Sequence, residues 1–397
     1  MNRLVQSIRL LRKAVTRRVE VARVVRRGRR RFSGDARFRM DYVEQGLLPR
    51  ATSEADDTAL LKRICDAWSK SMEGQATSSE TFQSHAWWKS IQEKNLEGGV
   101  MRALAARDYD SLREMYQNFF RDPCGAGVSG MPFPRTSRGH GMGASFKELQ
   151  LIDALHRIDL WKSRAGVRSE IADLKTPEVG NPFGTMVNGV FIRSGCEDQH
   201  YCAQKIIDLV GARHAAVVAE IGGGFGGMAY YLMRDHPGMT YVDFDLPETI
   251  ALASYYLLSA FPEIKATLYG EAELNAETLQ TSRIILMPSF AITTMPDASV
   301  DLMFNARLLF DLSPKSLHEY LTEFARITKD YVLHLNRREP SVAAHAWFQA
   351  NAPEFGLIER HPSNWNDART LYPNEMEYLY RRRPPGQLPS EPDRPAY

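Results

Sequence analysis

The sequence lacks any apolar run close to the roughly 20 residues that a membrane-spanning helix needs. Its basic N-terminus lacks the continuous apolar core of a secretory signal peptide, so we expect a cytoplasmic protein. Only four cysteines occur among 397 residues, and they form neither a Cys-x-x-Cys pair nor a zinc-type pattern with histidine. We therefore expect reduced, unpaired thiols and no metal site at Cys65, Cys124, Cys196 and Cys202.

Acidic residues are scarce at one end of the chain. Residues 1–40 hold 14 of the 50 Lys and Arg residues and only two of the 48 Asp and Glu residues, a net charge of +12. The remaining residues hold 36 basic and 46 acidic side chains, a net charge of −10. An acidic body suits a neutral small substrate better than a nucleic acid, which attracts basic surfaces.

The basic segment has the pattern of an amphipathic helix within a tail of residues 1–45. Over residues 1–32, apolar residues recur every three or four positions and arginines fill the other faces. Three interpretations stay open: a helix on an anionic membrane surface, a partner-docking helix or solvated tail, and a nucleic-acid-binding segment. The last is the least favoured because aromatic residues are almost absent there. The apolar stripe consists of Leu4, Ile8, Leu11, Val15, Val19 and Ala22.

The most informative stretch is residues 215–248. A β-branched apolar run over 217–221 is followed by five glycines between positions 222 and 227, a helical pattern, and a second strand ending at Asp245. Such a unit binds a ribose-bearing ligand. The glycines allow close approach of the backbone, and the carboxylate at the second strand accepts hydrogen bonds from ribose hydroxyls.

Glu220, two positions before the first glycine, discriminates between two ligands. The glycine spacing also satisfies the dinucleotide fingerprint, but a carboxylate at this position would repel a pyrophosphate. S-adenosylmethionine has no phosphate and carries a sulfonium and an ammonium, which a carboxylate favours. The sequence therefore predicts a methyl-donor site, with a nicotinamide or flavin site and a non-binding glycine turn as alternatives.

The same residues carry a resemblance to a known family. Glu220 to Gly227, Ala229 to Leu232, Asp245 to Thr249 and Ser254 to Leu257 resemble the sugar O-methyltransferase family of class I methyltransferases. Phe244 to Pro247 also resembles the ribose-binding segment of plant-type small-molecule O-methyltransferases, which favours Asp245 over Asp243 as the ribose ligand. The resemblance covers roughly residues 180–382. It implies a Rossmann-like α/β sandwich, with a mostly parallel seven-stranded sheet whose last strand is antiparallel.

The rest of the chain fits this organisation. Residues 50–180 look helical and are expected to shape the acceptor pocket or a dimer interface, with a glycine-rich segment over 123–143 as connector or lid. Residues 181–382 form the methyl-donor domain, and 383–397 a Pro-rich, disordered end. Within the domain, 181–199 is expected to be an ordered loop, and the resemblance implies that it helps to cover the ligand. Strands are expected at 284–287, 300–304 and 331–335, and an antiparallel pair at 355–359 and 377–380.

Ligands of open parallel sheets bind at the carboxyl ends of the strands, which gives the expected cofactor contacts. The glycines would approach the methionine and ribose parts, and Met287 and Ser289 would flank the adenine. For both strand-tip acids a merely solvated carboxylate is the alternative. The predicted set is Glu220, Gly222, Gly223, Gly224, Gly226, Asp245, Leu246, Met287 and Ser289.

A sugar hydroxyl is a poor acid, so methyl transfer to it calls for a general base or a metal ion. The candidate bases are Asp311, which could instead be a helix cap, and His334, which could instead be an interior histidine. Asn305 and Arg307 are candidate hydroxyl contacts, with structural roles as the alternative. The resembled family has a glutamate where this chain has Asp311, and a serine that this chain lacks. A divalent cation such as Mg²⁺ is compatible with the chemistry, but no residue pattern supports one.

The predicted function is S-adenosylmethionine-dependent O-methylation of a sugar hydroxyl in a glycan or glycosylated metabolite, as in polysaccharide biosynthesis. The rivals are an NAD(P)-dependent oxidoreductase, a nucleic-acid methyltransferase, and a non-catalytic methyltransferase-like scaffold in glycan assembly. The basic N-terminal helix could hold the enzyme at the inner face of a membrane. Homo-oligomerisation stays open.

Overall fold

A computed structural model describes residue 19 and residues 21–50, 56–93, 99–129, 143–166, 169–213, 215–365 and 375–384. Its centre is an eight-stranded sheet with the order β5-β6-β4-β3-β7-β8-β10-β9. The first six strands in this order pair in parallel, and β10 is antiparallel to both of its neighbours. The strands are β3 (Val217–Ile221), β4 (Thr240–Asp245), β5 (Ala266–Leu268), β6 (Ile284–Pro288), β7 (Val300–Ala306), β8 (Thr328–Arg337), β9 (Phe355–Pro362) and β10 (Glu375–Arg382).

This topology confirms the predicted α/β class, with a mostly parallel sheet and an antiparallel last strand. The sheet has one strand more than the seven expected. The additional strand, β5, has three residues and pairs with β6 at the edge of the sheet. A run this short carries too little periodicity to be recognised in a sequence.

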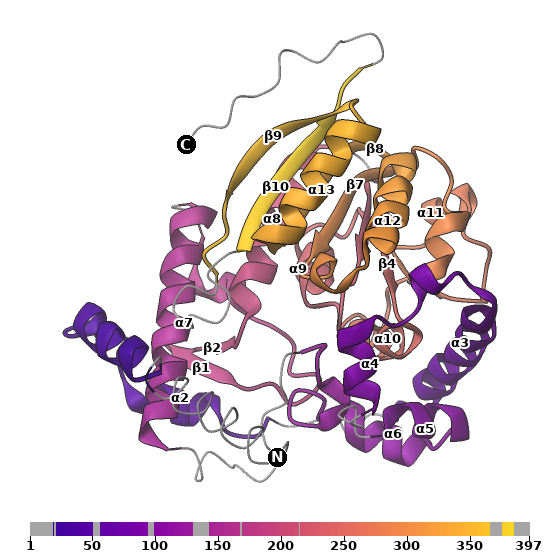
Figure 1. Ribbon diagram of the computed structural model, residues 1–397. Helices are drawn as coiled ribbons and strands as arrows, with labels where there is room; N and C mark the ends of the chain where they lie inside the picture. Colours follow the sequence, from indigo (N-terminus) through magenta and orange to yellow (C-terminus); the bar gives the residue numbers. More distant parts are fainter. Residues whose placement is uncertain are drawn as a thin grey trace, which may run out of the picture.

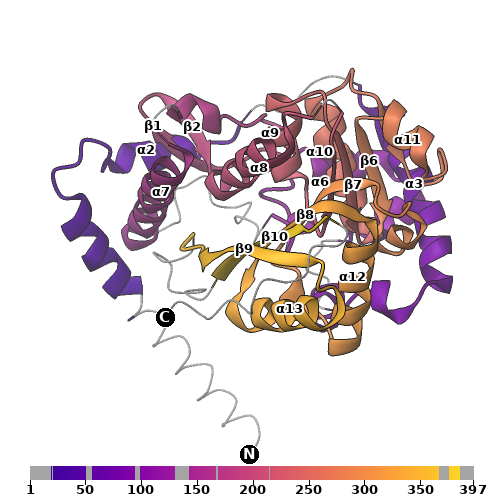
Figure 2. The same cartoon turned by 90° about the horizontal axis from the view of Figure 1, so that it is seen from above.

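Helices cover both faces of the sheet, as Figures 1 and 2 show. Alternate residues of a strand point to opposite faces, so Leu302 of β7 joins one core and Met303 the other. The first core contains residues of α8 (Cys196–Val210), α9 (Gly227–Asp235) and α10 (Pro247–Ala260). The second contains residues of α11 (Ala276–Thr281), α12 (Pro314–Ile327) and α13 (Arg338–Asn351). The result is a three-layer αβα sandwich.

The region before the sheet is helical, as predicted. Residues 21–32 form a helix, and further helices are α2 (Met40–Gly46), α3 (Thr58–Thr77), α4 (Ala86–Glu93), α5 (Val100–Ala106), α6 (Tyr109–Tyr116) and α7 (Ala144–Ala165). Short 3₁₀ turns occur at Glu80–Phe82, Pro123–Gly125 and Ile171–Leu174, and within the domain at Ser289–Thr294 and Leu309–Asp311. Most of the glycine-rich segment, residues 130–142, lies outside the described residues, as do residues 385–397.

Residues 181–199 depart from the expected loop. They contain a small antiparallel sheet of β1 (Gly184–Val187) and β2 (Val190–Arg193), and α8 begins at Cys196. The preceding Asn181 is held by the helical region, because its side chain accepts the backbone N–H of Arg50 and its carbonyl accepts Nε–H of Arg121. Asn181 is therefore held by the helical region.

Two further sequence expectations concern cysteine and membranes. All four cysteines lie among the described residues, where they are buried and no disulfide links them. Of the helices among the described residues, none has both the length and the apolar character that crossing a bilayer requires.

Candidate functional site

The glycine loop joins β3 to α9 at the carboxyl edge of the sheet. Gly222, Gly224 and Gly226 have φ angles of +76°, +63° and +86°, a region that favours glycine. At Gly223 the constraint is space, because a Cβ there would collide with the carboxylate of Asp243. The four predicted loop glycines are thus required by backbone geometry or by the acid beneath the loop.

Asp245, the last residue of β4, lies at the tip of the neighbouring strand. Its Oδ2 accepts the N–H of Gly224 at 3.0 Å and its Oδ1 accepts the N–H of Leu246 at 2.7 Å. The side chain is half-buried, and each carboxylate oxygen keeps acceptor capacity. Asp243, by contrast, is fully buried under the loop, where Oδ1 accepts the N–H of Gly223 at 3.2 Å. This placement supports Asp245, rather than Asp243, as the residue available to ribose hydroxyls.

Glu220 lies on β3 below the glycine loop and is only 3% exposed. Its Oε2 accepts the hydroxyl hydrogen of Tyr241 at 2.6 Å. Because the carboxylate is covered, it would act on a ligand mainly through its charge, and a direct contact stays a prediction.

Burial raises the pKa of all three acids. The pKa of Glu220 rises to about 8, with a further contribution from repulsion by Asp245, and the pKa of Asp245 rises to about 7. The pKa of Asp243 is raised well above its usual range by burial and then by the other two carboxylates. Its Oδ2 has no hydrogen-bond partner within the part of the chain that the structure describes. A cation placed beside this cluster would favour the charged forms.

The expected adenine contacts follow β6, which pairs with β4. Met287 is opposite Phe244, and Pro288 is opposite Asp245, so this strand end lies beside the ribose position. Ser289 is buried and begins a 3₁₀ turn, while Met287 packs into the second core. Their roles toward an adenine stay predictions.

Arg193 was not anticipated from the sequence. It lies on β2, is 3% exposed, and places its guanidinium 5.0 Å from the ring centroid of Phe225 in the glycine loop. It also hydrogen-bonds to the side chain of Gln199, which a Cβ at Gly227 would strike. Arg193 thus fixes the outer side of the glycine loop. A single arginine in a short strand gives no sequence signal of such a role.

Helix α4 of the N-terminal region contacts residues that follow two strands of the sheet. The carboxylate of Asp311, after β7, accepts the backbone N–H of Trp87 at 3.1 Å. Glu248, after β4, accepts Nε1–H of Trp88 at 2.7 Å and Nε2–H of Gln92 at 2.8 Å. Asp311 is therefore a cap, but of α4 rather than of the helix that follows it. Ser313 caps that following helix, α12.

His334 does not reach the strand tip. It is 1% exposed and stacks on Tyr378, with ring centroids 5.1 Å apart. Burial lowers its pKa to about 3, and neither ring nitrogen has a hydrogen-bond partner among the described residues. Because the ring lies in the second core, the structure contradicts the prediction of a general base and favours the interior histidine.

Asn305 and Arg307 at the end of β7 are both engaged in structural contacts. The amide of Asn305 donates to the carbonyl of Ile221 at 2.9 Å and accepts from Asn336 at 2.8 Å. The guanidinium of Arg307 pairs with Glu375 and Asp198, each at 2.7 Å. Asn305 is fully buried, so its predicted contact with a hydroxyl is corrected to a structural role, while Arg307 remains partly exposed.

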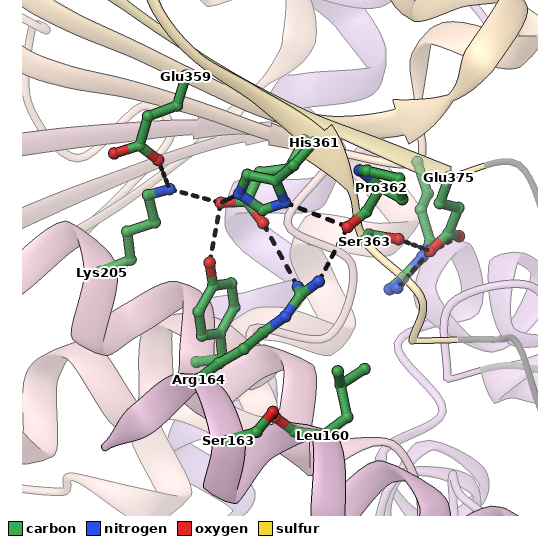
Figure 3. Close-up of polar contacts among 12 residues, drawn as sticks. Leu160, Ser163, Arg164, Lys205, Glu359, His361, Pro362, Ser363 and Glu375 are labelled. Atoms are coloured by element: carbon green, nitrogen blue, oxygen red, sulfur yellow. Dashed lines mark hydrogen bonds and ion pairs between the residues drawn. The ribbon is translucent and has the colours of Figure 1, made fainter. Parts of the chain in front are cut away.

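Among the described residues, one group has the spacing of metal ligands: Glu359, His361 and Glu377 on β9 and β10. Figure 3 shows Lys205 reaching into this group, with its ammonium 2.5 Å from Glu359 and 2.6 Å from Glu377. Arg164 lies 3.8 Å from Glu377 as well. Two fixed cations already neutralise these carboxylates, so the group is an ion-pair cluster and gives no support to a divalent metal in the reaction.

The chain matches one family model over residues 184–330, and that family is described as an O-methyltransferase domain. The match covers the glycine loop, Asp245 and Asp311. Residues 184–330 are therefore similar to an O-methyltransferase domain. A comparison with curated proteins finds no match.

Solved structures similar to this chain include the pyocyanin biosynthetic protein PhzM, at 14% identity over 45% of this chain and 54% of that chain, with a TM-score of 0.30. The chain thus spans about half the length of that protein. A SAM-dependent methyltransferase from Aquifex aeolicus matches at 14% identity over 45% and 89% of the two chains, with a TM-score of 0.31. For the N-methyltransferase NodS from Bradyrhizobium japonicum WM9 the values are 12%, 47% and 96%, with a TM-score of 0.33. Likeness at this level carries no argument about activity.

S-adenosylmethionine is the methyl donor of this class of domain, and the residues of the site fit it. Asp245 offers free acceptor capacity at the ribose position. The unsatisfied Oδ2 of Asp243 and the raised pKa of Glu220 reveal an excess of buried acid, which a sulfonium and an ammonium would relieve. A pyrophosphate would be repelled by the same cluster, so the dinucleotide alternative loses support.

Asp245→Asn is expected to weaken binding of S-adenosylhomocysteine about tenfold or more, because charge-assisted hydrogen bonds to the ribose are lost. Asp243→Asn is the matched control, and less than about a threefold change is expected since Asp243 is covered. Isothermal titration calorimetry measures both. The reverse order of effects would identify Asp243 as the ribose ligand.

The affinity for S-adenosylmethionine relative to S-adenosylhomocysteine is expected to rise between about pH 6 and about pH 8.5. The pKa values of about 7 for Asp245 and about 8 for Glu220 leave both acids largely protonated at pH 6 and largely ionised at pH 8.5, where their negative charge attracts the sulfonium. Both ligands carry the amino group, and only S-adenosylmethionine carries the sulfonium. The ratio of the two affinities therefore isolates the contribution of the sulfonium. Calorimetry at both pH values tests this, and Glu220→Gln should flatten the change. A ratio independent of pH in the wild-type protein would refute it.

Proposed function

We propose that the chain transfers the methyl group of S-adenosylmethionine to a sugar hydroxyl of a glycan or glycosylated metabolite. The supporting observation is the arrangement of the glycine loop over three acids, with Asp245 open at the strand tip, within residues that match an O-methyltransferase domain. This arrangement suits a cationic, ribose-bearing donor.

The side chains near the end of β7 favour the proposal of a polyhydroxylated acceptor. Trp87 is 43% exposed and contacts Phe310, with ring centroids 5.9 Å apart. The guanidinium of Arg337 lies 4.6 Å from the centroid of the same Phe310 ring. Aromatic faces beside hydrogen-bonding groups are typical of sites that orient a small polar ligand. The partly exposed Arg307 adds donors on the same strand end.

Asp311 is the proposed general base. S-adenosylmethionine supplies an activated methyl carbon, so the protein has to orient the acceptor hydroxyl and take up its proton. The carboxylate of Asp311 is half-buried, and its two oxygens share the backbone N–H of Trp87 and retain further acceptor capacity. It can therefore hold α4 and still receive the hydroxyl proton.

The direct test uses the full chain, labelled S-adenosylmethionine, and carbohydrate fractions from the source cells. We expect label in a carbohydrate product, with a mass gain of one methylene in the sugar by mass spectrometry. Label confined to protein, lipid or RNA would overturn the sugar assignment. Binding of S-adenosylhomocysteine with no labelled product in any fraction would favour the non-catalytic scaffold, and binding of NAD(P)H alone the oxidoreductase.

With the acceptor identified by the labelling experiment, Asp311→Asn is expected to lower kcat about 100-fold or more. The amide oxygen can still accept the N–H of Trp87, but it cannot take up a proton. Asp311→Ala should lower kcat and also raise KM, since α4 loses its cap. His334→Phe is the control, and the buried position predicts a kcat within about threefold of the wild type. Full activity of Asp311→Asn would exclude this base.

A further inference from the structure

The helix of residues 21–32 has two opposite faces. One face is apolar and packs on α7, because Val24, Val25 and Phe32 share a core cluster with residues 151, 152 and 155. Gly28 permits the close approach, since a Cβ there would collide with Ile152. Val21 packs against the same cluster. The apolar face is therefore covered by the protein itself.

The opposite face carries arginines at the same helical spacing. These four side chains are exposed, and no ion pair is recorded for them with any residue of the described ranges. On the flanks, Arg29 pairs with Glu148, and Arg31 pairs with Asp159 at 3.2 Å, which fixes the rotation of the helix on α7. The four arginines, here called the arginine stripe, are Arg23, Arg26, Arg27 and Arg30.

The position of the arginine stripe favours a flat anionic partner. Figure 1 shows the helix at the outer edge of the molecule, beside α7 and away from the sheet. The chain beyond residue 40 has a net charge of −10, so an anionic surface repels the body and attracts the stripe. One orientation results, with the helix against the surface and the body away from it.

We propose that the arginine stripe adsorbs the protein onto an anionic lipid bilayer. Because the apolar face of residues 21–32 is docked on α7, the contact is electrostatic, and this part of the helix does not insert as the sequence pattern suggests. Val19 and Ala22 of the predicted stripe are exposed beside the arginines. The helix exposes no aromatic side chain for base stacking, since Phe32 is buried, so RNA fits this surface less well.

Co-sedimentation with vesicles of phosphatidylcholine alone, or of phosphatidylcholine with phosphatidylglycerol, tests the proposal. We expect the full chain to bind only the anionic vesicles, more weakly at high salt. Since each basic residue near such a surface contributes about a fivefold gain, Arg23→Gln/Arg26→Gln/Arg27→Gln/Arg30→Gln should weaken binding about 100-fold or more. All four side chains point to solvent, and thermal unfolding of the variant checks that the fold is kept.

A second quadruple variant controls for total charge. Lys62→Gln, Lys265→Gln, Lys315→Gln and Arg360→Gln remove the same charge from exposed positions elsewhere, and vesicle binding should change less than about threefold. Equal losses in both variants, or an unchanged affinity of the stripe variant, would overturn the proposal. So would tighter binding of single-stranded RNA than of anionic vesicles in fluorescence anisotropy.

Discussion

The burial of Glu220 and Asp243 under one glycine loop, with the half-buried Asp245 beside them, is the constraint on which this structure depends. Glu220, Asp243 and Asp245 lie at adjacent strand ends, and the low polarity around them raises each pKa. The protein offsets part of this cost with Tyr241 and with backbone N–H groups of the loop. The loop can lie this close to Asp243 because Gly223 has no Cβ, which would collide with that carboxylate. The glycines and the acids are therefore one unit, and a cationic ligand completes it.

The helical region belongs to the same unit, because it shares a core with the sheet. Leu61 and Tyr116 of this region lie in one hydrophobic cluster with Val218 and Leu257 of the methyltransferase domain. Phe119 packs against Phe225, with ring centroids 5.6 Å apart, and so supports the glycine loop from outside. The segments that the sequence separates at residue 180 are thus packed together around the site.

The sequence predicted what depends on local pattern and left open what depends on tertiary contact. The glycine loop, the positions of the longer strands and the place of Asp245 at a strand end follow from periodicity and from residue types that only certain backbone conformations accept. The sequence could not reveal that Asp311 caps a helix about 220 positions earlier, because the two meet only through the fold. His334 between two leucines reads equally as a site residue or as a core residue, and only its stacking on Tyr378 decides. The role of Arg193 was not predicted because it depends on contacts with Phe225 and Gln199 that only the fold creates.

The two sides of the site differ in how firmly they are held. At the strand ends, Arg307 has a strained backbone φ of +59°. Its ion pairs with Asp198 of α8 and Glu375 of β10 hold the end of β7 in place despite this strain. Helix α4, which lies against these strand ends, has one buried residue, Ile91, and is held largely by hydrogen bonds to the carboxylates of Asp311 and Glu248. A helix anchored by so few contacts opens at lower free energy than the sheet beneath it. In the proposed methyl transfer, acceptor access would thus depend on α4 and donor binding on the rigidly held strand ends.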